Sequence, residues 1–301
     1  MEFYGMTGEK LGVIGQIDSS KPKSDDLPQW KKDLLQKPSV SVRKGIAWRW
    51  IVLAMREHEE EFIGSLGFDS PYEDTSTLVL TSKAGTFVDI RFPLNLAKSR
   101  PLTDDPAFWA FSGVASLRFY EGMPYTAHAA WTHDIDSRNE AIIDEGDLFV
   151  LGNGDCVETG LMKNPGTQRM EMYKEYWTSP GVVEMRPCVV ARTSEGESRQ
   201  GVVIRVGDYC QGIMTRHREG KGEEKQAKVL VERWERTRID GGKSEEEEER
   251  REWQKDGRSN TSDEDGDSVK VPCMWACRED RRMGDEIVVD GVQWKVVELV
   301  L

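Results

Sequence analysis

Residues 75–93 of the chain read TSTLVLTSKAGTFVDIRFP. Two runs rich in Thr, Val, Leu, Ile and Phe flank the short segment 83–85, which ends in Gly. This composition is typical of two β-strands joined by a tight turn. The stretch therefore predicts a β-hairpin, the basic unit of an antiparallel sheet.

The second run of this hairpin has two different faces. Alternate side chains of a strand point to opposite sides, which gives an apolar face of Val88, Ile90 and Phe92 and a mixed face of Phe87, Asp89 and Arg91. We expect the mixed face to lie in water, as is usual for an antiparallel strand. In the alternative, Asp89 and Arg91 lie inside a barrel, where a buried ion pair is costly and points to function.

Runs of the same kind continue along most of the chain and are closed by Gly, Pro, Asn or Asp. One of them ends in the clear turn signal Asn153-Gly154. Short, evenly spaced strands favour an all-β, mainly antiparallel fold that closes into a barrel or forms a sandwich. Because Pro180-Gly181 interrupts the pattern, we expect a first domain over 38–179 and a second over 180–301.

Three segments depart from the strand pattern. Residues 1–37 show no sustained period, and we expect a flexible N-terminal arm. Segment 49–70 contains apolar residues at roughly helical spacing followed by Glu-rich sequence, which predicts a short helical insertion. Segment 240–268, rich in Glu, Asp, Gly and Ser, predicts a disordered acidic loop.

The bulk properties exclude some classes of function. A net charge of −13 and a pI near 5.0 oppose binding to nucleic acid. No apolar run approaches the roughly 20 residues of a membrane span, so we expect no membrane insertion. The five cysteines have no paired spacing and fit reduced thiols. We therefore expect a cytoplasmic protein, with the nucleus as a further compartment that these properties allow.

Six segments, taken in order, resemble the fungal Hri-one family, whose members are named for interaction with a casein kinase: SVRKGIAW, TSTLVLTSKAGTFVDIRF, FWAFSG, DEGDLFVLGNGDCVETGLMKNPGTQRMEMYKEYW, VVIRVGDYCQGIM and GDEIVVDGVQWKVVE. The resemblance covers most of residues 39–301. It implies two lipocalin-like β-barrels, placement in cytoplasm and nucleus, and no defined molecular activity. It supplies no catalytic residues. The arm, the segment 49–70 and the long acidic loop depart from the family pattern.

The sequence offers few candidates for acid–base chemistry. We nominate His133, Asp134, Asp89 and Arg91, because imidazole titrates near neutral pH and can pair with a carboxylate. A surface or hydrogen-bonded histidine is the alternative reading of His133. His128 is five residues from His133, so the two point to opposite faces of one strand, and we predict no metal site.

Large aromatic residues could hold an apolar ligand. We nominate Trp109, Trp131 and Tyr176 as ligand-binding residues, with core filling as the alternative for the tryptophans. No GxSxG, P-loop or dinucleotide fingerprint occurs, and we expect no cofactor.

Our leading hypothesis is a binding module for a small apolar metabolite, a protein partner such as a casein kinase, or both. The alternative is a cofactor-free cyclase or isomerase that acts on a fungal polyketide or terpenoid, a secondary metabolite, in a barrel cavity.

Overall fold

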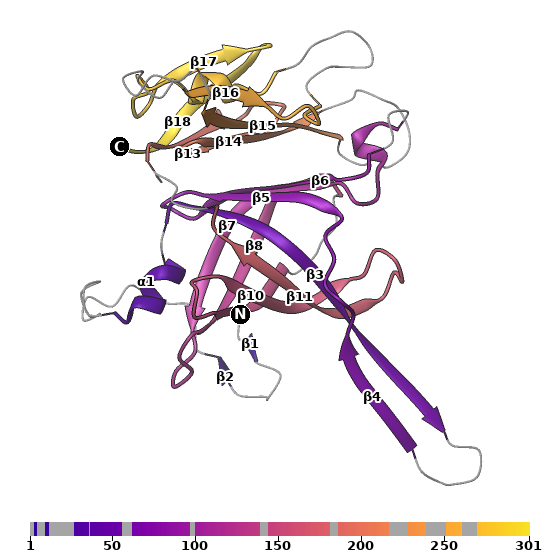
Figure 1. Ribbon diagram of the computed structural model, residues 1–301. Helices are drawn as coiled ribbons and strands as arrows, with labels where there is room; N and C mark the ends of the chain where they lie inside the picture. Colours follow the sequence, from indigo (N-terminus) through magenta and orange to yellow (C-terminus); the bar gives the residue numbers. More distant parts are fainter. Residues whose placement is uncertain are drawn as a thin grey trace, which may run out of the picture.

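A computed structural model gives the fold of the chain (Figure 1). It describes residues 3–4, 10–11, 27–35, 37–55, 62–96, 100–138, 144–180, 186–216, 228–238, 251–260 and 270–301. Within these ranges almost all regular structure is antiparallel β-sheet, so the predicted all-β class is confirmed.

The first sheet has nine strands in the order β11-β10-β9-β8-β7-β6-β5-β3-β4. Its members are β3 (Ser39–Met55), β4 (Phe62–Phe68), β5 (Thr75–Thr81), β6 (Thr86–Pro93), β7 (Trp109–Phe119), β8 (Thr126–Asp136), β9 (Asp144–Val150), β10 (Cys156–Lys163) and β11 (Met170–Thr178). A further pairing joins β11 to β3, so that eight of the strands close into a barrel of the lipocalin-like kind. Closure leaves the barrel without free edges.

The predicted helical insertion at 49–70 is wrong. Strand β3 runs for 17 residues, and its far end pairs with β4 from Arg49↔Phe68 to Met55↔Phe62. This hairpin projects from the barrel (Figure 1). Helical spacing and strand composition are hard to separate in short apolar runs, and here the β-branched and aromatic residues decide the outcome.

The second sheet has seven strands in the order β16-β15-β14-β13-β12-β18-β17. They are β12 (Cys188–Thr193), β13 (Gly201–Val206), β14 (Tyr209–Arg216), β15 (Lys228–Arg238), β16 (Arg251–Lys255), β17 (Glu286–Val289) and β18 (Val292–Val300). It curls as a half-barrel with β16 and β17 at its edges, so the second unit is not a closed barrel. The prediction of a disordered loop over 240–268 is wrong for residues 251–255, because these form strand β16 and pair with β15. Residues 239–250 and 261–269 lie outside the described residues.

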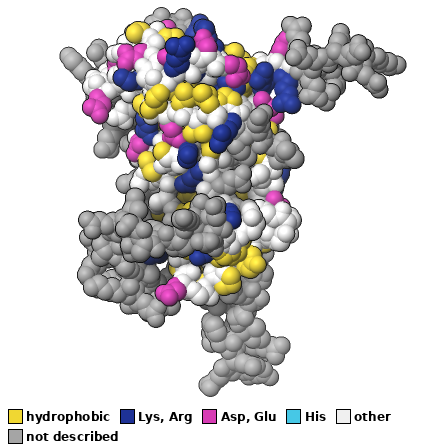
Figure 2. All heavy atoms as spheres, turned by 90° about the vertical axis from the view of Figure 1, so that its left-hand side faces the viewer, with side chains coloured by type: hydrophobic (Ala, Val, Ile, Leu, Met, Phe, Trp, Pro, Cys, Tyr) yellow, Lys and Arg dark blue, Asp and Glu magenta, His cyan; other side chains and the backbone are white. Residues whose placement is uncertain are grey.

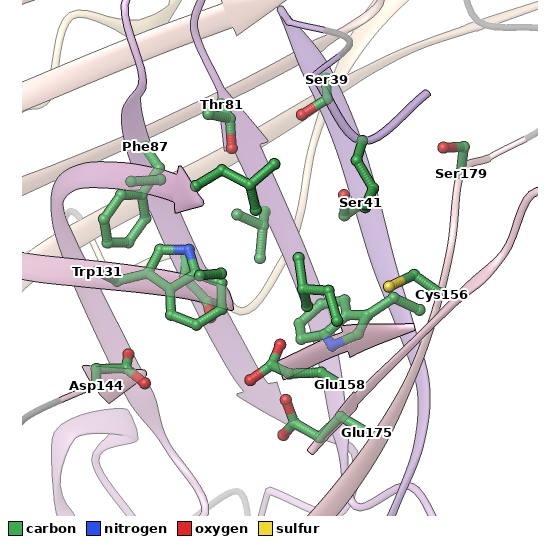
Figure 3. A pocket seen from close by; sticks show the side chains of 18 of the residues that line it. Ser39, Ser41, Thr81, Phe87, Trp131, Asp144, Cys156, Glu158, Glu175 and Ser179 are labelled. Atoms are coloured by element: carbon green, nitrogen blue, oxygen red, sulfur yellow. The ribbon is translucent and has the colours of Figure 1, made fainter. Parts of the chain in front are cut away.

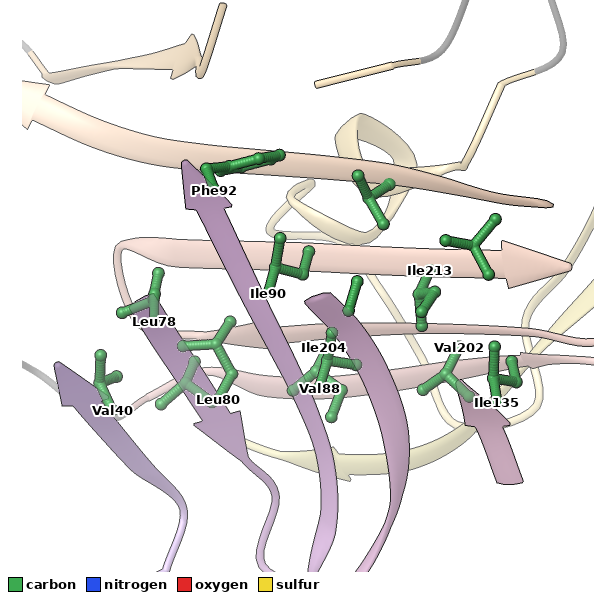
Figure 4. Packing of buried hydrophobic residues seen from close by; sticks show 14 of the residues in the cluster. Val40, Leu78, Leu80, Val88, Ile90, Phe92, Ile135, Val202, Ile204 and Ile213 are labelled. Atoms are coloured by element: carbon green, nitrogen blue, oxygen red, sulfur yellow. The ribbon is translucent and has the colours of Figure 1, made fainter. Parts of the chain in front are cut away.

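The outside of the barrel and one face of the second sheet share a hydrophobic core (Figure 4). Val88, Ile90 and Phe92 of β6 are fully buried in it, and Ile204 and Ile213 lie opposite them. Each Å² of apolar surface removed from water contributes about 25 cal/mol, so the many buried side chains of this core hold the two sheets together. The barrel therefore has a dry outer wall on this side.

The other face of the second sheet forms a separate core under the short helix α2 (Cys273–Ala276). Trp294 of β18 is its largest fully buried side chain. The remaining described elements are helix α1 (Gln29–Leu35), the 3-10 turn η2 (Leu102–Asp104) and the two-residue strands β1 (Phe3–Tyr4) and β2 (Lys10–Leu11). Both sheets therefore have a hydrophobic core on at least one side.

One face of the surface is shown in Figure 2, where acidic and basic side chains are intermingled at the top of the molecule. None of the helices within the described ranges has the length and apolar character needed to cross a bilayer.

Candidate functional site

The interior of the barrel contains a cavity of about 230 Å³. One end, which we call the mouth, is lined by Ser39 and Ser179, and the other end, the floor, by Glu158 and Glu175 (Figure 3). Most of the wall between them is aromatic or aliphatic and is made by Val79, Phe87, Trp109, Phe111, Trp131, Leu148, Val150, Met162 and Trp177. The cavity is thus apolar along its length and carboxyl-rich at its floor.

Strand β6 turns its charged side chains into this cavity. All eight of its residues are buried, because Phe87, Asp89 and Arg91 line the barrel interior while the alternate side chains enter the core shared with the second sheet. The expectation that the mixed face lies in water is therefore wrong. Asp89 is 3% exposed and Arg91 9%.

Arg91 is held at the floor by two carboxylates. Its Nε and Nη2 donate to Asp89 Oδ2 at 3.0 and 2.9 Å, and its Nη1 donates to Glu175 Oε1 at 3.3 Å. The guanidinium carbon lies 4.8 Å from the ring centroid of Trp109, within the range of a cation–π contact. Burial opposes the charged form, but Asp89 and Glu175 raise the pKa of Arg91 above its usual value.

Arg43 of β3 also contacts the same glutamate. Its Nη1 donates to Glu175 Oε1 at 2.5 Å, and its Nη2 and Nε donate to the two oxygens of Glu73. The contact to Glu175 bridges β3 and β11, the strands whose pairing closes the barrel. Glu175 thus lies between two arginines, and both arginines are fully engaged with carboxylates.

Glu158 of β10 lies beside Glu175 but has a different partner. Its Oε1 accepts a 2.6 Å hydrogen bond from the hydroxyl of Tyr173. Burial, together with the negative charge of Glu175, raises the pKa of Glu158 to about 8. Gly160 makes room for this pair, since a Cβ at that position would lie 2.6 Å from the Tyr173 hydroxyl oxygen.

His133 lies behind the cavity wall, stacked on Phe111 with ring centroids 4.3 Å apart. Its Nδ1 is 2.8 Å from Asp136 Oδ2, and its Nε2 is 2.9 Å from Asp144 Oδ2. Burial lowers the pKa, but the hydrogen bonds to the two aspartates more than compensate and raise it to about 9. His133 is therefore protonated at neutral pH and fixed in place, as in the hydrogen-bonded alternative considered for it.

A β-bulge explains this arrangement. The register of β7 and β8 shifts between Ser112 and Gly113, so that Asp134 is the extra residue of β8 and the alternation reverses after it. Asp136 consequently reaches the same side as His133. Gly113 permits the bulge, because a Cβ there would lie 1.7 Å from the main-chain oxygen of Thr132.

The nominated residues separate into two groups. Asp89, Arg91, Trp109 and Trp131 line the cavity, and His133 contacts its wall. Two others lie away from it. Asp134 is an exposed residue whose carboxylate is 3.5 Å from Arg192, and Tyr176 hydrogen-bonds to Asp155.

Sequence reasoning left out three residues of the charged floor and its surroundings, namely Arg43, Glu73 and Asp144. It also gave no reason to place Glu158, Tyr173 and Glu175 together. One signal was present: Tyr173, Glu175 and Trp177 alternate along β11 and line the cavity together. Their partners come from strands far away in sequence, 132 residues in the case of Arg43 and Glu175.

The mouth is partly covered by helix α1. Leu34 of this helix lines the cavity, and Trp30 packs against Phe119 and Tyr125 with ring centroids 5.5 Å apart in each pair. Lys37, just after the helix, lines the mouth as well, and burial lowers its pKa. A ligand that enters from this end passes Lys37 before it reaches the aromatic wall.

Metal ligation has no support in the described ranges, which contain no cluster of three or more His, Cys, Asp or Glu side chains arranged to hold an ion. His128 and His133 belong to different sides of β8, since His128 pairs with Asp147 and Glu145 and does not line the cavity.

Comparison with known proteins supports the fold. A sequence model of the family described as Protein HRI1 matches residues 39–298. Among solved structures the chain is similar to YLR301w, an uncharacterized protein from Saccharomyces cerevisiae, with a TM-score of 0.53 and 16% sequence identity over 85% of this chain and 99% of that one. At this identity the likeness concerns the fold alone. No curated protein matches the chain.

Proposed function

This chain belongs to the Protein HRI1 family, which confirms the resemblance seen in the sequence, and on that premise we propose that it is a binding protein that takes a small, largely apolar ligand into its barrel. The observation that carries the proposal is the cavity itself. It has a largely aromatic and aliphatic wall, a mouth at one end and a cluster of charged side chains at the floor. Ligand sites of proteins typically combine an apolar pocket with a few fixed polar groups.

The size of the cavity restricts the ligand. Its volume of about 230 Å³ lies below the usual range for drug-sized ligands, roughly 300–1,000 Å³. The rings of Trp109 and Phe111 lie side by side in the wall, with centroids 4.5 Å apart and planes tilted by 38°. A compact aromatic molecule of one or two rings matches both features.

The alternative of a cofactor-free cyclase or isomerase is less well supported. Its nominated acid–base residues are either engaged or misplaced, since Arg91 is bound by two carboxylates, His133 is fixed between two aspartates and Asp134 lies outside the cavity. Glu158 is a cavity side chain with a pKa suited to proton transfer, but its neighbour Glu175 is bound by Arg43 and Arg91. Its other neighbour, Tyr173, has a raised pKa that opposes loss of its proton.

Binding of naphthalene, a neutral two-ring probe, tests the proposal through ligand-observed NMR with the full chain. We expect saturable binding at a single site, and its loss in Ala129→Phe, which fills the cavity from β8. Ala130→Phe is the matched control, because Ala130 is the next residue of the strand and does not line the cavity.

Circular dichroism verifies that both variants fold. If Ala129→Phe does not fold, Trp131→Ala replaces it, with the expectation that enlarging the cavity changes the affinity for naphthalene. Binding that is unaltered in every cavity variant would contradict the proposal.

A further inference from the structure

The floor of the cavity has more carboxyl groups than cations. At this end the lining carries one cation, Arg91, and four carboxyl groups, Asp89, Asp144, Glu158 and Glu175. Arg43 and His133 contact Glu175 and Asp144 from behind the lining, but each is shared with a further carboxylate, Glu73 and Asp136 respectively. A buried carboxylate without a compensating cation is costly, so such a site either retains protons or receives a positive charge. The excess of carboxyl groups therefore favours a ligand that brings a positive charge to the floor.

The arginines cannot receive an anionic ligand. Every terminal nitrogen of Arg91 donates to Asp89 or Glu175, and one face of its guanidinium is covered by Trp109. Arg43 is likewise occupied by Glu73, Glu175 and Thr75. A carboxylate or phosphate that reached the floor would meet acidic side chains and cations that already have partners.

Two carboxyl groups retain unused capacity. Asp89 is 3% exposed, and its Oδ1 has no hydrogen-bond partner within the described part of the chain. Glu158 accepts the Tyr173 hydroxyl, and none of the described cationic side chains lies within ion-pair distance of it. An unpartnered buried acceptor in a native structure calls for an explanation. A hydrogen-bond donor supplied by a ligand would satisfy it.

We propose that the ligand of this barrel is a small aromatic amine, whose protonated nitrogen is received by Glu158 and Asp89 at the floor and whose ring lies between Phe87, Trp109 and Trp131. This inference rests on the proposed binding function. The ammonium group supplies the donors and the positive charge that the floor lacks, and charge-assisted hydrogen bonds of this kind are about twice as strong as neutral ones. The aromatic wall adds cation–π attraction as well as apolar contact.

Three matched probes of nearly equal size test the inference by isothermal titration calorimetry with the full chain at pH 7. Tryptamine carries an amine that is protonated at this pH, tryptophol carries a hydroxyl at the same position, and indoleacetate carries a carboxylate. We expect tryptamine to bind roughly tenfold or more tightly than tryptophol, and indoleacetate to bind most weakly.

Glu158→Gln identifies the receiving group. The amide keeps the shape of the side chain and an acceptor for Tyr173 but cannot ionise when the ammonium group binds, so the preference for tryptamine over tryptophol should fall to about threefold or less. Asp147→Asn is the matched control, since Asp147 bonds to Tyr120 and His128 and does not line the cavity. This control should retain the wild-type preference.

The possible results distinguish failure of the amine specificity from failure of the proposed binding function. If naphthalene enters the cavity but tryptophol binds as tightly as tryptamine, or tryptamine does not bind, the amine specificity is overturned and the binding function stands. If neither naphthalene nor any of the indoles enters, both fail. A preference for tryptamine that persists in Glu158→Gln and in Asp89→Asn would also overturn the inference, because it would place the amine elsewhere.

Discussion

Arg233 of the second sheet donates a 2.6 Å hydrogen bond from Nη2 to the main-chain oxygen of Ile90 in the barrel. Its Nε donates to Gln211 Oε1 at 2.8 Å, and Gln211 in turn donates to the main-chain oxygen of Leu78 at 2.9 Å. The two sheets are therefore joined by polar contacts inside a hydrophobic core. Burial lowers the pKa of Arg233 to about 10, which leaves the side chain charged at neutral pH.

We expect Arg233→Ala to lower the free energy of unfolding by about 3–5 kcal/mol, because it removes a buried cation and leaves main-chain oxygens at the junction without donors. Denaturant unfolding followed by tryptophan fluorescence measures the loss. Arg236→Ala, on the same strand with a partly exposed ion pair to Glu279, should cost about 1 kcal/mol or less. Equal losses in the two variants would disprove the special role of the junction.

Gly160→Ala should destabilise the floor of the barrel. The added methyl group would lie 2.6 Å from the Tyr173 hydroxyl oxygen, so the tyrosine must move away from Glu158. Overpacking of this kind typically costs about 1–3 kcal/mol. Gly152→Ala is the control, because nothing lies within 4 Å of a Cβ at that position. Thermal unfolding of both variants checks the expectation, and an unchanged melting temperature for Gly160→Ala would refute it.

The stability of the protein should fall as pH rises through neutrality and beyond. The pKa of His133 is raised from 6.5 to about 9, so the folded chain keeps a proton that the unfolded chain releases. The stabilisation is present in full below about pH 6.5, amounts to at most about 3 kcal/mol, and is lost as pH passes through 9. Glu158 acts in the same direction, because its pKa is raised from 4.5 to about 8.

Melting temperatures across this pH range test the linkage. His133→Gln should flatten the decline between pH 6.5 and 9, and Thr132→Ser, a neighbour that does not titrate, should keep the wild-type slope. A decline that is equally steep in His133→Gln would assign the effect to other groups.

Cys156 offers a chemical readout of the cavity. It lines the wall and is partly exposed, and burial raises its pKa to about 12, so alkylation by iodoacetamide should be slow at pH 7. Saturating naphthalene should slow it further, by roughly tenfold if the ligand covers the thiol at ten times its dissociation constant. Mass spectrometry of the labelled peptides measures both rates, with the fully buried Cys188 as internal control. Rapid labelling of Cys156 despite bound probe would contradict the proposed ligand position.

The sequence predicted the strands well but could not orient the decisive one. Period-2 alternation correctly separated Val88 and Ile90 from Asp89 and Arg91. The usual rule then places the more apolar face inside. Here that face is buried against a second sheet, and the barrel interior takes the charged face. A local pattern contains no information about which of two buried compartments a face enters.

The charged floor was hidden for a related reason. Glu175 meets Arg43 only because β11 pairs with β3 when the barrel closes, and Asp136 meets His133 only because a bulge reverses the alternation of β8. Closure and bulges are long-range features of the sheet. Spacing along the chain therefore identified His133, Asp89 and Arg91 as residues of interest without showing how they are joined.

Strand β6 separates the barrel cavity from the core between the two sheets, and none of its eight residues faces solvent. Asp89 and Arg91 line the cavity on one side, and Ile90 between them packs in the core between the two sheets on the other. A substitution in the cavity that shifts this strand therefore also shifts the packing of that core, and the reverse also holds. Residues on the two faces of β6 should therefore change together in evolution, because a substitution on one face also disturbs the other.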